Sequence, residues 1–194
     1  MSETLLKVDN LGITFGGLKA VQKVNMYLNR GELTGLIGPN GAGKTTMFNM
    51  LTGVYAPTEG SIIFGGKSIA GLDPYKVTRQ GISRTFQNIR LFKELSVLDN
   101  VKVANHGLAK HNLLSSIFRL PSHFKGEAKM EEESLAFLKI FGLDVYKDEL
   151  AKNLPYGMQR RLEIARALAA GPKLLLLDEP AAGMNPQETH DLME

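Results

Sequence analysis

Residues 38–46 read Gly38-Pro39-Asn40-Gly41-Ala42-Gly43-Lys44-Thr45-Thr46 and match the phosphate-binding pattern G-x-x-x-x-G-K-[ST]. The glycines let the backbone curve around a phosphate chain, so that successive N–H groups face the anion. We expect Lys44 to reach the β- and γ-phosphates and the Thr45 hydroxyl to ligate Mg²⁺. The apolar run 33–37 predicts a buried strand before the loop, and residues 45–51 predict an apolar-faced helix after it. The chain is therefore predicted to bind a nucleoside triphosphate through this loop.

A second motif near the end of the chain supports this prediction. Residues 174–180 read Leu174-Leu175-Leu176-Leu177-Asp178-Glu179-Pro180, an apolar run that ends in two carboxylates. Such a run is typical of a parallel strand buried on both faces, and ligands bind open α/β sheets at the C-terminal ends of strands. Asp178 is predicted to hold the Mg²⁺ shell, and Glu179 to polarise the attacking water. The run alone is only a moderately specific sign of a nucleotide site, because many strands end in Asp.

Composition excludes several other classes of protein. The 194 residues are 43% hydrophobic and 22% charged, which suits one ordinary globular domain. A formal charge of +3 without a dense Lys/Arg block argues against nucleic-acid binding. The absence of cysteine excludes disulfides and thiolate metal sites and suits a reducing compartment. The first residues lack a signal-peptide pattern, and no apolar run approaches the roughly 18–20 residues of a membrane span. We therefore expect any membrane association to go through a partner.

The remaining pattern predicts strands first and helices later. Residues 5–10 and 21–28 predict short strands around a Gly16-Gly17 turn, and residues 61–64 predict a strand that ends at a glycine hairpin. A further strand is predicted over 82–86. From about residue 97 to residue 152 the period becomes helical, with one helix stopping at Gly142. Scattered Ser, His, Pro and Gly over 107–128 predict a variable insertion.

Together these residues resemble the ATP-binding cassette (ABC) ATPases over the whole chain. Gln87 falls at the position of that family's Q-loop glutamine, which couples the Mg²⁺ and γ-phosphate site to the membrane partner. Phe15 falls where the family stacks an aromatic ring on adenine, and residues 181–185 resemble its D-loop. The resemblance implies catalytic roles for Glu179, Lys44 and Gln87. It implies metal contacts for Thr45, Gln87 and Asp178. Its signature segment, which acts on the partner cassette's nucleotide, matches Leu154, Pro155, Tyr156, Gly157, Met158 and Gln159.

The resemblance implies an α/β P-loop NTPase fold, with a RecA-like parallel sheet as its core. Residues 1–30 and 58–72 would form an N-terminal antiparallel β subdomain, and 91–153 a helical insertion subdomain. Residues 31–57, 73–90 and 154–194 would form the nucleotide-binding core. Within the family, the stretches 83–92 and 156–166 and the insertion after Asn105 are most similar to the ATP-binding subunits of Liv-type importers of branched-chain amino acids.

That likeness implies ATP and Mg²⁺ as cofactors and a peripheral position on the cytoplasmic side of the membrane. The implied partners are a second cassette in a head-to-tail dimer, two membrane permeases and, indirectly, a substrate-binding protein outside the membrane. Nucleic acid is not an expected partner. Three alternatives stay open: transport of another substrate, a soluble ABC ATPase acting on DNA, ribosomes or metal-cluster assembly, and a non-hydrolysing regulatory module.

The chain departs from the family pattern in two places. Pro155 and Tyr156 stand where the family usually has Ser and Gly, and proline supplies neither a hydroxyl nor an N–H for a γ-phosphate contact. The family also has a switch histidine on a strand well beyond the D-loop. His190 lies too close to Glu179 for that role and is expected on a helix surface. The other histidines, 106, 111 and 123, lack metal-ligand spacing. We therefore expect the chain to be incomplete at its C-terminal end and inactive in hydrolysis on its own, whereas the complete protein is expected to be an ATPase that couples hydrolysis to transport.

Overall fold

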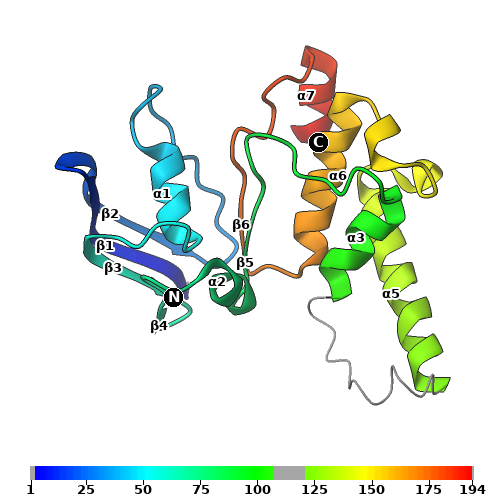
Figure 1. Ribbon diagram of the computed structural model, residues 1–194, viewed down its shortest axis with the longest axis horizontal. Coiled ribbons are helices and arrows are strands. Elements are labelled where there is room, and N and C mark those ends of the chain that lie inside the picture. The colour runs from blue at the N-terminus through cyan, green and yellow to red at the C-terminus, as the bar shows by residue number, and fades with distance from the viewer. Residues whose placement is uncertain (1–2, 107–120, 194) are drawn as a thin grey trace. The chain divides into compact units, whose positions relative to one another are not determined.

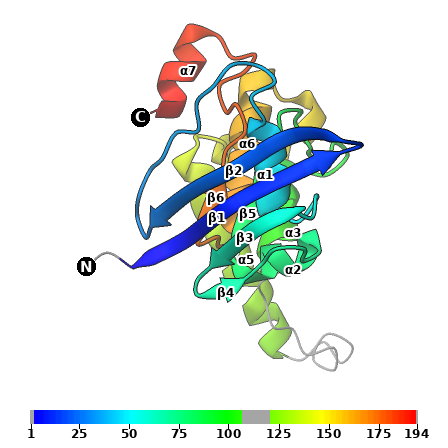
Figure 2. The same ribbon diagram turned by 90° about the vertical axis from the view of Figure 1, so that its left-hand side faces the viewer.

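Alternating apolar residues build an antiparallel sheet in the first part of the chain. The computed structural model describes residues 3–106 and 121–193, and the chain divides into two compact units, Met1–Ile82 and Ser83–Glu194. The sheet of the first unit has the order β2-β1-β3-β4 (Figures 1 and 2). Its strands are β1 (Thr4–Phe15), β2 (Leu18–Asn29), β3 (Glu59–Phe64) and β4 (Lys67–Ser68). The two predicted hairpins are therefore confirmed, with longer strands than the sequence suggested.

The register places apolar side chains of the three longer strands opposite one another. Val8 of β1 lies opposite Met26 of β2 on one side and Ile62 of β3 on the other. Helix α1 (Lys44–Leu51) packs against the sheet and buries Met47, Met50 and Leu51. A short helix α2 (Pro74–Gln80) follows β4 and ends at Gly81. The phosphate-binding loop is thus attached to a helix with a buried face, which fixes the position of the helix N-terminus within this unit.

The second unit is mainly helical. Helices α3 (Val97–His106), α5 (Pro121–Ile140) and α6 (Tyr156–Ala169) pack against one another (Figure 1). Two 3₁₀ turns, η1 (Asp144–Tyr146) and η2 (Ala151–Asn153), connect α5 to α6, and α7 (Pro186–Met193) closes the chain. Strand β5 (Ile82–Arg84), which starts at the unit boundary, pairs with β6 (Leu174–Leu176).

One apolar core holds the three long helices together. Its buried members come from α3, α5, α6 and the connection between α5 and α6: Val97, Leu98, Val101, Leu138, Leu143, Ala151, Leu154, Leu162, Ala165 and Ala169. Full burial of a Val or Leu side chain contributes about 1.5–3 kcal/mol. The predicted helix stop at Gly142 is confirmed, because α5 ends at Ile140 and Gly142 has a φ of +65°. The core explains why α6, which begins with the signature segment, is rigidly placed in this unit.

Several sequence predictions were wrong in detail. Residues 33–37 form no strand, and Leu33 and Ile37 are 99% and 93% exposed. Strand β6 exists but only Leu176 is buried, and β5 is shorter than the predicted 82–86. Part of the segment 107–128, predicted as a variable insertion, is helical, because α5 begins at Pro121; residues 107–120 lie outside the described part. An apolar run buries both faces only where other elements cover it, and no described strand pairs with 33–37.

Candidate functional site

The glycine-rich loop ends at a residue that only glycine can occupy without strain. Gly43 is the N-cap of α1 and has a φ of +85°, in the left-handed region. A β-carbon there would lie 2.9 Å from Val21 Cγ2 and 3.0 Å from the carbonyl oxygen of Ala20. The loop therefore approaches β2 closely, and the N–H groups of the first turn of α1 open toward the loop. A helix N-terminus of this kind attracts anions, because its first N–H groups have no partner inside the helix.

The Lys44 ammonium lies over the same loop. Its Nζ donates hydrogen bonds to the carbonyl oxygens of Gly38, at 2.6 Å, and Pro39, at 2.9 Å. The positive charge thus sits inside the curve of the loop, beside the helix N-terminus. Thr45 follows Lys44 in the first turn of α1, so its hydroxyl comes from the same turn. This arrangement supplies a cation and a hydroxyl next to a row of N–H donors, which suits a polyphosphate.

Phe15 lies at the end of β1 with 42% of its surface exposed. Its ring meets Tyr55 edge to face, with 5.2 Å between the ring centroids. An exposed aromatic pair offers a flat surface to a base, but adenine stacking by Phe15 stays a prediction.

The two acidic residues after β6 have different surroundings. Asp178 is buried, and its Oδ2 accepts a hydrogen bond from Arg84 Nη2 at 2.8 Å. Glu179 is exposed, and its Oε2 accepts a hydrogen bond from Gln87 Nε2 at 3.3 Å. The structure therefore brings together Glu179 and Gln87, which lie far apart in the sequence. It also adds Arg84, a partner of Asp178 that sequence reasoning missed.

A buried ion pair on α6 was also missed. Arg160 and Glu163 are each 1% exposed, and Arg160 Nη1 lies 2.5 Å from Glu163 Oε2. In the sequence they belong to a charged stretch that resembles a solvated helix face. The available signal is their i,i+3 spacing, which places them on one side of a helix whose neighbouring residues, Leu162 and Ile164, are apolar.

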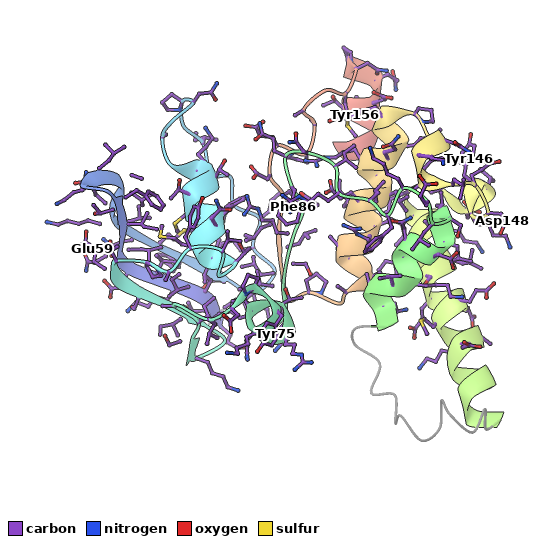
Figure 3. All side chains as sticks on the ribbon, in the orientation of Figure 1. Glu59, Tyr75, Phe86, Tyr146, Asp148 and Tyr156 are labelled. Atoms are coloured by element: carbon purple, nitrogen blue, oxygen red, sulfur yellow. The ribbon has the colours of Figure 1, made fainter. Side chains whose placement is uncertain are left out.

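The signature segment divides into core residues and surface residues. Leu154 is buried in the helical core, and Met158 packs against that core. Pro155 is the N-cap of α6, and Tyr156 is 46% exposed and donates a hydrogen bond to the carbonyl oxygen of Ala182 (Tyr156 is labelled in Figure 3). Gly157 is buried beneath the Glu188 carboxylate, since a β-carbon there would meet Glu188 Oε1 at 2.4 Å. Gln159 Nε2 donates to the carbonyl oxygen of Leu154 at 2.7 Å.

The residues predicted to hold Mg²⁺ have suitable donor atoms. Thr45 offers a hydroxyl, Gln87 an amide oxygen and Asp178 a carboxylate, all hard oxygen ligands of the kind Mg²⁺ prefers. Thr45 belongs to the first unit and the other two belong to the second. In the described residues, no three His, Cys, Asp or Glu side chains cluster as they would around a soft or purely acidic metal site. His190 is exposed on α7, as expected.

Among the described helices, none combines the length and the apolar character that crossing a membrane requires.

Comparison with known proteins agrees with this geometry. A family model described as ABC transporter matches residues 21–182. The high-affinity branched-chain amino acid transport ATP-binding protein LivG of Escherichia coli K12 is 46% identical over 194 residues, which are all of this chain and 76% of that protein. BraF of Pseudomonas aeruginosa, with the same description, is 46% identical over 192 residues, 99% of this chain and 75% of its own.

Two solved structures have the same fold. An ATP-binding cassette of an ABC transporter in its ADP conformation superimposes with a TM-score of 0.81 at 32% identity, covering 98% of this chain and 74% of that one. A dimeric cassette in a post-hydrolysis state, bound to ADP and Pi, gives a TM-score of 0.79 at 25% identity, with coverages of 97% and 80%. The resemblance to Liv-type cassettes and the predicted P-loop NTPase fold are thereby confirmed. The chain belongs to the ABC transporter family, as an ATP-binding cassette.

Proposed function

We propose that this chain is the ATP-binding subunit of an ABC importer, which in the complete protein couples ATP binding and hydrolysis to the uptake of branched-chain amino acids. The observation that supports this most is the 46% identity to LivG over every residue of the chain, with the phosphate-binding loop, Gln87, the signature segment and the Asp178-Glu179 pair all in order. The chain covers 76% of LivG, so these segments fall within the shared part.

Each site residue has a defined role in this proposal. Lys44 and the N–H groups of the loop bind the β- and γ-phosphates by charge-assisted hydrogen bonds. Glu179 is the base that polarises the attacking water, and the Gln87 amide, 3.3 Å from its carboxylate, orients that carboxylate. Phe15 supports the adenine ring. In this proposal the protein catalyses ATP hydrolysis mainly by positioning the reactants and by stabilising the charge of the transition state, with little covalent chemistry of its own.

Thr45, Gln87 and Asp178 would hold Mg²⁺. When bound, this cation neutralises charge on the phosphate oxygens. Arg84 pairs with one oxygen of Asp178, Oδ2, and so fixes the orientation of that carboxylate on its buried site.

The complete site requires a second cassette. In the proposed head-to-tail dimer, the N-terminus of α6 faces the nucleotide bound by the partner, and the helix dipole supplies positive potential there. The Glu188 carboxylate, which covers Gly157 in this structure, must then move aside. Tyr156 replaces the family's small residue and is hydrogen-bonded to Ala182 within its own chain. We assign it to holding the D-loop segment 181–185 against the start of α6.

The contact with the permease is proposed on the segment after Gln87. The structure separates two neighbouring apolar residues of this segment: Leu91 packs against the helical core, whereas Phe92 is 50% exposed. The guanidinium of Arg166 lies over the Phe92 ring, 5.4 Å from its centroid. A half-exposed aromatic ring held by a cation suits an anchor in a protein interface. In this proposal the chain lies on the cytoplasmic side of the membrane, bound through its permeases.

The test is reconstitution with the two permeases and the binding protein in vesicles. ATP hydrolysis should rise when leucine, isoleucine or valine is added with the binding protein. The Glu179→Gln variant should still bind ATP but lose turnover, because the base is lost while the loop is intact. Stimulation by a different substrate class would contradict the assigned cargo. A chain that hydrolyses ATP but does not co-purify with permeases would favour a soluble ABC ATPase.

A further inference from the structure

The guanidinium of Arg160 binds the backbone on both sides of Glu179. It donates to three consecutive carbonyl oxygens, those of Asp178 at 2.6 Å, Glu179 at 3.0 Å and Pro180 at 3.2 Å. One nitrogen, Nη1, also donates to the carbonyl oxygen of Phe86 at 2.5 Å and to Glu163. All five N–H donors of the side chain therefore have acceptors. A single buried side chain thus holds the whole turn that follows β6.

That turn contains an unusual backbone conformation. Glu179 has a φ of +46°, one of three positive φ values among the described non-glycine residues. L-residues with a β-carbon rarely adopt this region, because the β-carbon crowds the following carbonyl. Strained residues persist where the surroundings fix them, and they cluster at active sites. Here the fixing group is Arg160, because it bonds the carbonyl oxygens of the residues before, at and after the positive φ.

Glu163 extends the same connection to the segment that carries Gln87. Its Oε2 pairs with Arg160, and its Oε1 accepts from the backbone N–H groups of Phe86, at 3.4 Å, and Arg90, at 3.3 Å. The ion pair therefore ties the residues on both sides of Gln87 to the turn at Glu179 (Phe86 is labelled in Figure 3). A buried ion pair gives little net stability over an apolar pair of the same volume, so stability alone does not account for it.

We infer that Arg160, braced by Glu163, is a positioning residue for ATP hydrolysis. It holds the backbone of Glu179 so that the carboxylate meets Gln87, and it acts without touching the nucleotide. Lysine cannot replace it, since an ammonium has three donors where this site uses five, arranged in a planar fork. The inference rests on the proposed ATPase activity, and its test separates the two.

The test compares Arg160→Lys with Arg30→Lys in the assembled transporter. Arg30 also pairs with a glutamate, Glu3, but on the surface, where the two side chains are 52% and 71% exposed. Because small misplacements of a catalytic group are costly, Arg160→Lys should lower kcat roughly 10- to 100-fold while the KM for ATP changes less than about twofold. Arg30→Lys should change neither. The affinity for a non-hydrolysable ATP analogue should match the wild type in both variants.

A second pair of variants removes the ambiguity of a folding defect. Glu163→Gln keeps an oxygen for the N–H groups of Phe86 and Arg90 but removes the charge opposite Arg160, so kcat should fall with an unchanged affinity for the analogue. In a Glu179→Gln background, single-turnover hydrolysis should not slow further when Arg160→Lys is added, because the carboxylate that Arg160 positions is already gone. The inference would be overturned if Arg160→Lys slowed hydrolysis by the same factor with Glu179 and with Gln at position 179. Weakened binding of the analogue, or a wild-type kcat in Arg160→Lys, would also overturn it. A wild-type assembly without ATPase activity would instead contradict the proposed function.

Discussion

Replacing Gly43 by alanine should destabilise the first unit by an amount that can be worked out from its surroundings. A residue with a β-carbon at a φ of +85° costs about 1–2 kcal/mol. The new methyl group would also press on Val21 Cγ2, at 2.9 Å, and on the Ala20 carbonyl oxygen, at 3.0 Å, and such overpacking costs about 1–3 kcal/mol. The expected loss in unfolding free energy is therefore about 2–5 kcal/mol, a large share of a typical stability of roughly 5–15 kcal/mol.

The matched control is Gly31→Ala. Gly31 has a similar φ of +77°, but a β-carbon there would meet nothing within 4 Å. Only the conformational cost of about 1–2 kcal/mol remains. Urea unfolding followed by circular dichroism would compare the two variants at a common m-value. Gly43→Ala should also weaken ATP binding in a titration, and Gly31→Ala should not. Equal stability losses in the two variants would refute the close approach of loop and strand.

Three further outcomes are expected. Lys44→Ala should weaken Mg-ATP binding roughly 10- to 150-fold, because a charge-assisted hydrogen bond of about 1.5–3 kcal/mol is lost; unchanged affinity by calorimetry would contradict this role. Arg84→Met should lower the unfolding free energy by about 3–5 kcal/mol, because it leaves the buried Asp178 carboxylate without its cation. Adding Asp178→Asn to the same chain should restore part of that loss, as measured by urea titration. The hydrogen bond and charge of Lys76 hold the pKa of Asp73 below its ordinary value. The contribution of this exposed pair to the free energy of unfolding is therefore present at neutral pH and is lost as the pH falls through that pKa. Lys76→Met should raise the pKa of Asp73 in an NMR titration.

The parts of the fold that were predictable from the sequence are those with a local cause. The loop 38–46, the turn at Gly16-Gly17 and the stop at Gly142 depend on glycine geometry, which needs no knowledge of distant residues. The run 33–37 was predicted wrongly, because its five residues show apolar character but not which element covers them. Leu33 at 99% exposure shows how far composition alone can mislead.

The residues of the candidate site were predictable from the sequence where a local motif determines their chemistry. They were not predictable where contacts between distant residues determine it. Lys44, Asp178 and Glu179 follow from their motifs, whereas the pairing of Arg84 with Asp178 joins the last residue of β5 to a residue that follows β6. The burial of Arg160 and Glu163 was missed for a related reason. Charged residues are almost never fully buried without a partner, and the acceptors of Arg160 are mostly backbone carbonyls that no side-chain pattern reveals.

The hydrogen bonds from Lys44 to the carbonyls of Gly38 and Pro39 have a consequence for how nucleotide binding is measured. The two carbonyls use two of the three N–H donors of the ammonium, so a phosphate that takes more than one donor must displace a carbonyl, which then needs water or another donor. The enthalpy of binding is therefore smaller in magnitude than the enthalpy of the lysine–phosphate contact alone. The affinity, in contrast, also includes the attraction between the lysine charge and the phosphate charge. Calorimetric enthalpies will understate the importance of this lysine, and the salt dependence of the affinity will report its charge more directly.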